Sequence, residues 1–413
     1  MAGRQRVRTV ALDEHASVTP IELFFDLVFV FTLTQVTTLM AADLTARGVI
    51  RGVLVISVLW WCWVGWAWLG NLVRADEGAT RVAMFIAMAA MFVAALTIPE
   101  SFTDLPGGLS GPVVFAVCYF VVRAAHFGMF WWAGGGDPGL RRQLIRFIPS
   151  VVIGTGLLLV ASQLTGAAQT IMWFGALIGD YLGTVLAGAS GWRVNSASHF
   201  AERHGLVIIV AFGESIVSIG IGVTALPISW PIIVASILGL MIAAALWWAY
   251  FDVVALVAER VLARAQGEAR ARLARDSYSL LHLPMVVGII FLSLGLKKVM
   301  SYVGGADGHT LSDRLYGIPL IALYGGAALY LLAHVAFRWR NIHSVNRQRT
   351  AVAVLLLALI PLAALLPALA TLGLLAAILV GLIAFEALRY AAARDAVRHH
   401  GDIATSGPNP SVP

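Results

Sequence analysis

The sequence predicts an all-α integral membrane protein, a bundle of about twelve membrane-spanning helices. Its composition is the first observation: 60% of the 413 residues are hydrophobic and only 12% are charged, whereas a soluble domain carries roughly 25% charged residues. Apolar runs of membrane-spanning length recur along the chain. Basic residues gather in alternate connections between these runs. Together these observations exclude a soluble globular enzyme and make the lipid bilayer the first expected partner.

The N-terminal segment, residues 1–20, is polar and basic and lacks the apolar core of a cleavable signal peptide. Twelve apolar runs follow, each long enough for a membrane-spanning helix. They cover residues 21–41, 49–71, 80–98, 111–132, 145–163, 168–189, 203–223, 228–251, 280–301, 314–337, 350–367 and 369–390. Because only the region of Pro367 separates the last two runs, eleven spans remain an alternative. Residues 391–413 form a cytoplasmic tail that we expect to be disordered, with Gly401 to Pro413 rich in Gly, Pro and Ser.

The distribution of basic residues indicates how the predicted spans are oriented in the membrane. Most of the 28 Lys and Arg residues fall in connections on the same side as the N-terminus. The positive-inside rule then predicts that both termini are cytoplasmic. The net charge of +6 reflects this topology, and no nucleic-acid partner is implied. All basic residues except Lys297 and Lys298 are Arg, a bias that suggests a GC-rich bacterial genome. The expected location of this multi-pass protein is the bacterial plasma membrane. In the longest inner connection, residues 252–279, we expect an amphipathic cytoplasmic helix.

The two halves of the chain carry similar features in the same order. The paired features are Glu22 with Glu202, Leu59–Trp63 with Leu246–Tyr250, Ala125–His126 with Ala333–His334, and Arg141–Gln143 with Arg347–Arg349. We interpret them as two parallel repeats of six helices, residues 21–190 and 191–390, an architecture known in transporters. The alternative is that aromatic belts and loop arginines recur in any membrane protein.

Two carboxylates open the first apolar run. Glu22 and Asp26 are four residues apart, so a helix places them on one face. A charge in a lipid-embedded helix is costly and normally faces a protein interior or a watery cavity. The pair is therefore a functional-site hypothesis, with Asp26 the stronger candidate. Glu22, like Glu202 at the start of the seventh run, has the alternative role of capping a helix N-terminus.

Further ionisable residues lie within or beside the apolar runs. Together with the pair above, they form a predicted polar path for a substrate or ion: Glu22, Asp26, Arg123, His126, Asp180, Glu202, Arg203, Glu214 and His282. Arg203 and Glu214 are eleven residues apart, which is about three helical turns and returns to the same face. Asp26 and Glu214 are the candidates for catalysis or ion binding. The alternative is a set of structural ion pairs, with Arg123 bound to Glu214 or Asp180.

Other signals are weak or missing. The aromatic run from Trp60 to Trp68 is typical of interfacial anchors, although a run this long must turn some rings inward. The sequence contains no phosphate-binding loop, no His-Glu-x-x-His motif and no zinc-type spacing of His and Cys. We therefore expect no cofactor and no metal.

Three motifs resemble the signatures of the bacterial low-temperature-requirement A family. The first is Thr19 to Phe31, the second is His199 to Leu206 followed by Gly213-Glu214-Ser215-Ile216, and the third is Asp276 to Pro284 with its Tyr-x-x-x-His-x-Pro pattern. The resemblance covers nearly the whole chain. It implies a polytopic bacterial membrane protein, associated by name with growth in the cold, with no general biochemical activity established. Its signature positions fall on Glu22, Asp26, Glu202, Arg203 and Glu214.

Three function classes remain open. A transporter or channel for a small solute or ion, coupled to protons through the buried carboxylates, fits the repeat and the polar path, and we favour it. A membrane-embedded enzyme is the alternative. In it, a buried carboxylic acid protonates a lipid or isoprenoid, as in a cyclase. The third class is a structural or sensory protein without turnover. Neither the substrate nor the oligomeric state follows from the sequence.

Overall fold

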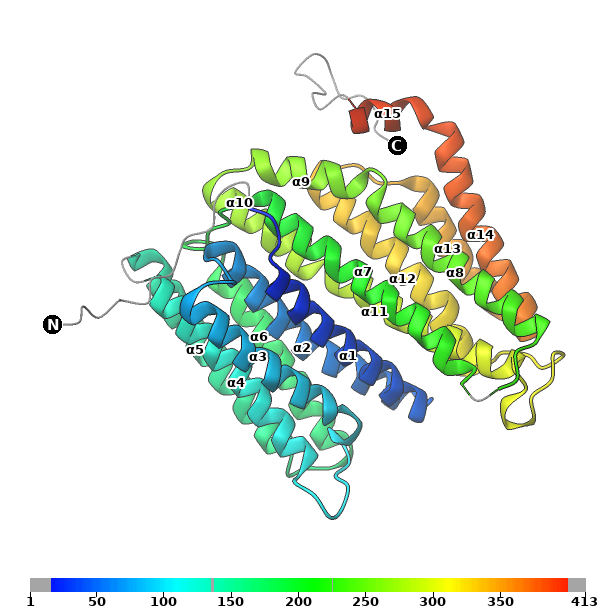
Figure 1. Cartoon of the computed structure of the whole chain (residues 1–413), viewed down its shortest axis with the longest axis horizontal. Helices are drawn as coiled ribbons and strands as arrows, with labels where there is room; N and C mark the ends of the chain where they lie inside the picture. Colours follow the sequence, from blue (N-terminus) through cyan, green and yellow to red (C-terminus); the bar gives the residue numbers. More distant parts are fainter. Residues whose placement is uncertain (1–15, 135–136, 225, 400–413) are drawn as a thin grey trace. The chain divides into compact units, whose positions relative to one another are not determined.

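The computed structural model describes residues 16–134, 137–224 and 226–399, and helices dominate this part of the chain. The first six long helices are α1 (Pro20–Ala42), α2 (Ala46–Leu72), α3 (Gly78–Leu96), α4 (Gly111–Ala133), α5 (Pro138–Ala161) and α6 (Gly166–Ala187). The later long helices are α7 (Ala197–Gly222), α8 (Trp230–Phe251), α11 (His282–Val303), α12 (Gly317–Ile342), α13 (Arg347–Ala363) and α14 (Ala368–Arg389). Each of the twelve predicted apolar runs is thus largely helical (Figure 1).

Ten stretches of the described chain are long and apolar enough to cross a membrane. They confirm a multi-pass helical membrane protein. The two predicted spans outside this set are α6 and α13. Helix α13 has 17 residues and begins with the polar sequence Arg347 to Thr350, which leaves it short of a full apolar span. The predicted number of twelve spans is therefore not confirmed.

The connection at residues 252–279 differs from the single amphipathic helix expected there. It contains α9 (Val254–Arg264), α10 (Gly267–Leu273) and a π-helical turn, Ala274–Leu280, that leads into α11. The helix breaks because Gly267 has a φ of +52°, in the left-handed region that ends right-handed helices. A further helix, α15 (Ala391–His399), follows α14, so the first part of the predicted disordered tail, residues 391–399, is helical. The predicted disordered end, Gly401 to Pro413, lies outside the described residues.

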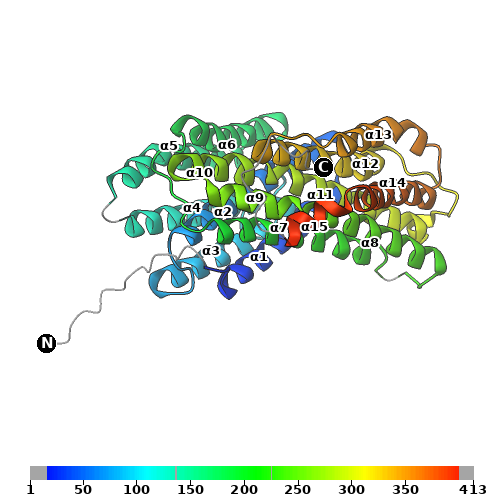
Figure 2. The ribbon, with the colours of Figure 1, turned by 90° about the horizontal axis from the view of Figure 1, so that it is seen from above.

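The chain forms two compact units. The first unit comprises residues 1–206 and 265–275, and the second comprises residues 207–264 and 276–413. In the first unit, α3 packs on α4, α4 on α5, and α5 on α6, while α2 contacts α1, α4 and α6 (Figure 2). In the second unit, α11 packs on α12, α12 on α13, and α13 on α14, while α8 contacts α11, α12 and α14. Helix α7 contributes residues to both units.

Glycines bring α11 and α12 into close contact in the second unit. A Cβ atom added at Gly326 would lie 2.6 Å from the carbonyl oxygen of Gly288 and 2.6 Å from the amide nitrogen of Leu292. These atoms belong to the backbone of α11, which has no freedom to move aside as a side chain would. Small residues at such crossings let helix backbones approach each other, which is a main source of helix association in lipid.

We therefore predict that Gly326→Ala lowers the stability of the second unit by about 1–3 kcal/mol, since overpacking a tight contact carries roughly that cost. Gly325→Ala is the matched control, because its Cβ would meet only the Ile321 side chain at 3.9 Å. The measurement is thermal unfolding of the purified protein in detergent. Equal midpoints for the two variants would contradict this account of the α11–α12 contact.

Candidate functional site

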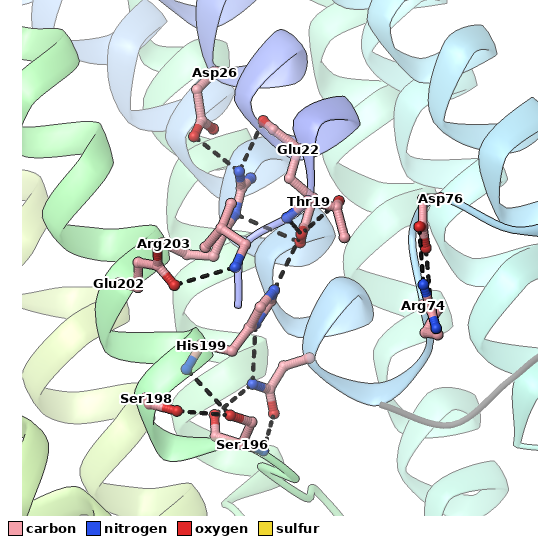
Figure 3. Close-up of polar contacts among 12 residues, drawn as sticks. Thr19, Glu22, Asp26, Arg74, Asp76, Ser196, Ser198, His199, Glu202 and Arg203 are labelled. Carbon is pink, nitrogen blue, oxygen red and sulfur yellow. Dashed lines mark hydrogen bonds and ion pairs between the residues drawn. The ribbon is translucent and has the colours of Figure 1, made fainter. Parts of the chain in front are cut away.

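The N-terminal turns of α1 and α7 contribute a buried group of ionisable residues in the first unit, which we call the carboxylate cluster: Glu22, Asp26, His199 and Arg203 (Figure 3). The guanidinium of Arg203 is its centre. Nη1 of Arg203 donates to Oδ2 of Asp26 at 2.8 Å and to the backbone oxygen of Glu22 at 2.8 Å. Nε of Arg203 lies 3.8 Å from Oε1 of Glu22. All four side chains are at most 1% exposed.

Glu22 also caps the helix that carries it. Its Oε2 accepts hydrogen bonds of 2.9 Å from both the backbone amide and the hydroxyl of Thr19, and one of 3.1 Å from Nε2 of His199. The carboxylate side of a capping box is thereby formed at the start of α1. The Glu22 side chain can therefore cap α1 and also belong to a functional site. The three hydrogen bonds that its Oε2 accepts favour the ionised form of its carboxyl group.

Asn71 in α2 determines which nitrogen of His199 carries the proton. Oδ1 of Asn71 accepts from the backbone amide of Asn195 at 2.7 Å, and Nδ2 of Asn71 donates to the backbone oxygen of Ser196 at 2.6 Å. The amide group is thus oriented, and Nδ2 is the atom 3.3 Å from Nδ1 of His199. A donor facing Nδ1 requires that nitrogen to accept, so the proton resides on Nε2, which donates to Glu22. In this arrangement the imidazole of His199 links the Asn71 amide to the Glu22 carboxyl group.

Trp63 of α2 completes the environment of Asp26. Its indole Nε1 donates to Oδ1 of Asp26 at 2.8 Å, and the Arg203 guanidinium lies 5.5 Å from its ring, within range of a cation–π contact. Trp63 in turn stacks on Trp60 with ring centroids 5.0 Å apart. All five tryptophans between residues 60 and 68 are buried in the first unit. The expected role of this run as an interfacial anchor is therefore wrong, and it forms part of the core.

A second buried polar group in the first unit surrounds Asp180 of α6. Nη2 of Arg123 donates to Oδ1 of Asp180 at 3.2 Å, and the Ser150 hydroxyl donates to the same oxygen at 2.7 Å. The Tyr119 hydroxyl donates to the other oxygen, Oδ2. Of the two partners expected for Arg123, the structure thus selects Asp180. The pair joins α4 to α6, with one positive and one negative charge.

The remaining predicted site residues lie elsewhere. Glu202 accepts a hydrogen bond of 3.1 Å from the amide of Val18 and is exposed. His126 packs against Gly65 and the Trp66 ring in the first unit. In the second unit, Oε1 of Glu214 accepts from the Ser218 hydroxyl at 2.9 Å, and Nε2 of His282 lies 2.8 Å from the Tyr250 hydroxyl. Among the residues of the predicted polar path, Glu22, Asp26 and Arg203 thus lie in one group, and Arg123 and Asp180 lie in another.

Sequence reasoning missed the neutral partners of these charges. Tyr119 and Ser150 at Asp180 were not singled out, and neither was Asn71 at His199. A neutral donor in an apolar helix carries no spacing signal of its own, because a hydroxyl or amide is tolerated at many positions. Among the described residues, no group of three or more His, Cys, Asp and Glu side chains is placed to hold a metal ion.

Comparison with known proteins adds two findings. The family of bacterial low temperature requirement A proteins matches residues 17–384 of the chain. An uncharacterized protein of Rhizobium meliloti (strain 1021) is 26% identical over 321 residues, which cover 74% of this chain and 75% of that protein. No solved structure matches.

The balanced pair of Arg123 and Asp180 generates a stability prediction. Arg123→Met leaves the Asp180 charge buried without its cation, and breaking a buried ion pair costs about 3–5 kcal/mol. Adding Asp180→Asn should restore most of that loss, since the amide is neutral. Its oxygen accepts from one of the two hydroxyls, Tyr119 or Ser150, and its nitrogen can donate to the other. Unfolding in detergent with increasing dodecyl sulfate measures both variants. A double variant as unstable as Arg123→Met alone would contradict the pairing.

Proposed function

The chain belongs to the bacterial low temperature requirement A protein family, and on that premise we propose that it is a proton-linked transporter of a small solute or ion, with its proton site in the carboxylate cluster. One observation carries this proposal. The cluster contains two carboxyl groups, Glu22 and Asp26, and one guanidinium, that of Arg203. We take the fourth member, His199, as neutral, because its Nδ1 faces the amide donor of Asn71. With both carboxyl groups ionised, the cluster has a net charge of −1.

An unbalanced charge buried in a membrane protein is costly. One bound proton makes the carboxylate cluster neutral, whereas the pair of Arg123 and Asp180 is neutral without one. This difference separates a proton site from a structural ion pair. Asp26 is the expected carrier of the proton, because Glu22 accepts three hydrogen bonds on a single oxygen and is better stabilised as the anion.

Protonation would alter the link between two helices. With Asp26 ionised, the 2.8 Å contact to Arg203 ties the first turns of α7 to α1. A proton on Asp26 removes the charge that attracts the guanidinium and so weakens this link. Because α7 continues from the first unit into the second, a change at its N-terminal turns reaches both units through the chain itself. A helix contact with two states, one with Asp26 ionised and one with Asp26 protonated, is what links proton binding to a conformational change.

The packing of the two units supports the duplicated architecture on which the proposal draws. If α1 to α6 correspond in order to α7, α8, α11, α12, α13 and α14, then the contacts α3–α4, α4–α5 and α5–α6 correspond to α11–α12, α12–α13 and α13–α14. The contacts of α2 with α4 and α6 correspond to those of α8 with α12 and α14. Parallel repeats of this kind are a transporter architecture.

Proton flux tests the proposal. Purified protein is reconstituted into liposomes containing a pH-sensitive dye, and a potassium diffusion potential drives protons inward. We expect wild-type flux above that of empty liposomes. With Asp26→Asn we expect at least about tenfold less flux than wild type, which corresponds to a rise of about 1.4 kcal/mol in the rate-determining barrier. Glu22→Gln removes the other carboxyl group, so its flux, compared with that of Asp26→Asn, shows which of the two groups carries the proton.

Asp76→Asn is the matched control. It makes the same chemical change in the connection between α2 and α3, where the hydrogen bond from Arg74 lowers the pKa of Asp76. Its flux should equal that of wild type. Wild-type liposomes that carry no more protons than empty ones, or an Asp26→Asn variant that carries as many as wild type, would overturn the proposal.

The orientation of the chain is a separate expectation, since Arg-rich connections favour the cytoplasmic side. Green fluorescent protein fused after Pro413 should fluoresce, because it matures in the cytoplasm, and alkaline phosphatase fused there should be inactive. Phosphatase inserted after His309, in the connection between α11 and α12, should be active. The reverse pattern would refute the proposed topology.

A further inference from the structure

The first three turns of α5, in the first unit, carry an exposed group of arginines. They are Arg141, Arg142 and Arg146, and all three side chains are exposed. The helix contains no acidic residue along its whole length. The residue that caps it, Asp137, is already bound by another arginine, since Oδ2 of Asp137 lies 2.8 Å from Nη2 of Arg193. This end of α5 is therefore a surface of positive charge.

The arginines stand at positions that the helix itself disfavours. Positive charge in the first turns of a helix opposes the macrodipole, which favours Arg or Lys at the other end. Arg142 and Arg146 are also four residues apart, a spacing that brings two like charges together on a helix surface and destabilises the helix. The positive-inside rule requires basic residues near a span but not within its helix. A negatively charged partner would offset both costs.

Two tryptophans of α4 border these arginines. Trp131 and Trp132 lie in the last turn of α4 and are 45% and 41% exposed, in contrast to the buried tryptophans of α2. Helices α4 and α5 pack against each other (Figure 1), and the Arg141 guanidinium lies 5.3 Å from the Trp131 ring, within range of a cation–π contact. Exposed tryptophans of membrane proteins are typical of the headgroup level of the bilayer. We call Arg141, Arg142, Arg146, Trp131 and Trp132 the arginine surface.

The exposed face of α5 becomes apolar beside and beyond the arginines. Ile145, Ile148 and Val152 are all exposed there. Because α5 is long and apolar enough to cross a membrane, these side chains are at the depth of the acyl chains. A partner on this face thus meets guanidiniums at one end and aliphatic side chains at the other. A phospholipid has this arrangement of charge and hydrocarbon, whereas a soluble anion would use only the charged end.

We propose that the arginine surface binds the headgroup of an anionic phospholipid such as phosphatidylglycerol. Arg142 and Arg146, one turn apart, would hold the phosphate, because guanidiniums match the geometry of phosphate oxygens and form charge-assisted hydrogen bonds with them. The indoles of Trp131 and Trp132 would lie beside the glycerol, with an apolar ring and one N–H donor each. Neither the proton site nor the transport reaction enters this inference.

The test uses the full chain in phosphatidylcholine nanodiscs that contain phosphatidylglycerol with a photoactivatable headgroup. After irradiation, mass spectrometry locates the labelled residues. We expect saturable labelling of α5 and of the last turn of α4. Excess unlabelled phosphatidylglycerol should suppress it, zwitterionic phosphatidylethanolamine should leave it unchanged, and rising sodium chloride should weaken it by screening. Equal suppression by water-soluble glycerophosphoglycerol would identify a free phosphate diester as the ligand and overturn the lipid proposal.

Replacing Arg142 and Arg146 together by Gln should raise the fraction of phosphatidylglycerol needed for half-maximal labelling at least about fivefold. This corresponds to about 1 kcal/mol, the contribution of one basic residue near an anionic membrane surface. The matched control replaces Arg264 and Arg389 together by Gln. Both are exposed and lie in the last turns of α9 and α14, where their charge suits the helix dipole. Half-maximal labelling of the control should need the wild-type fraction.

Thermal unfolding in detergent separates a lipid site from a structural role of the two arginines. Removing the like-charged pair relieves repulsion within α5, so the variant of Arg142 and Arg146 should unfold no earlier than wild type. Earlier unfolding would assign these arginines to the fold and contradict the proposal. Absence of saturable labelling on α4 and α5 of the wild type, or equal half-maximal labelling of this variant and the wild type, would overturn it.

Discussion

The Arg203 guanidinium is the group on which the buried chemistry of the first unit depends. It is 0% exposed, and it reaches Asp26, the backbone of Glu22 and the face of Trp63 at once. A buried arginine remains charged, so the carboxyl groups around it must supply the balancing charge. Two are present where one suffices, and this surplus distinguishes the carboxylate cluster from an ordinary interhelical ion pair. In the proposed transporter, the excess carboxyl group is the one that binds the proton.

The two buried networks of the first unit differ in the balance of their charges. At Asp180, one cation, two hydroxyl groups and one carboxylate satisfy each other, and nothing in their charges requires a further ligand. At Asp26 the partners are a cation and an indole, and a second carboxylate lies one turn away. Charge balance, rather than burial, tells the two apart, because both aspartates are about 1% exposed.

The sequence predicted the helical elements well and the chemistry of the sites only partly. Apolar length is a local property, so every long helix was located, with ends that differ from the predicted bounds by up to seven residues. The i to i+4 spacing placed Glu22 and Asp26 on one buried face of α1 correctly. The break at Gly267 was missed because a single glycine in a charged, helix-favouring connection gives no strong stop signal. The tryptophans of α2 were misassigned because composition cannot separate an interfacial ring from a buried one. Asn71 could not be found at all, since its role depends on contacts with residues more than 120 positions away.

A neutral side chain in place of Asp26 would have avoided the imbalance in the carboxylate cluster, because buried ion pairs are no cheaper than well-packed apolar groups. Retaining an unbalanced charge in a low-dielectric environment has a cost. That cost is offset where the charge holds a ligand, and in the proposed transporter a proton at Asp26 is that ligand.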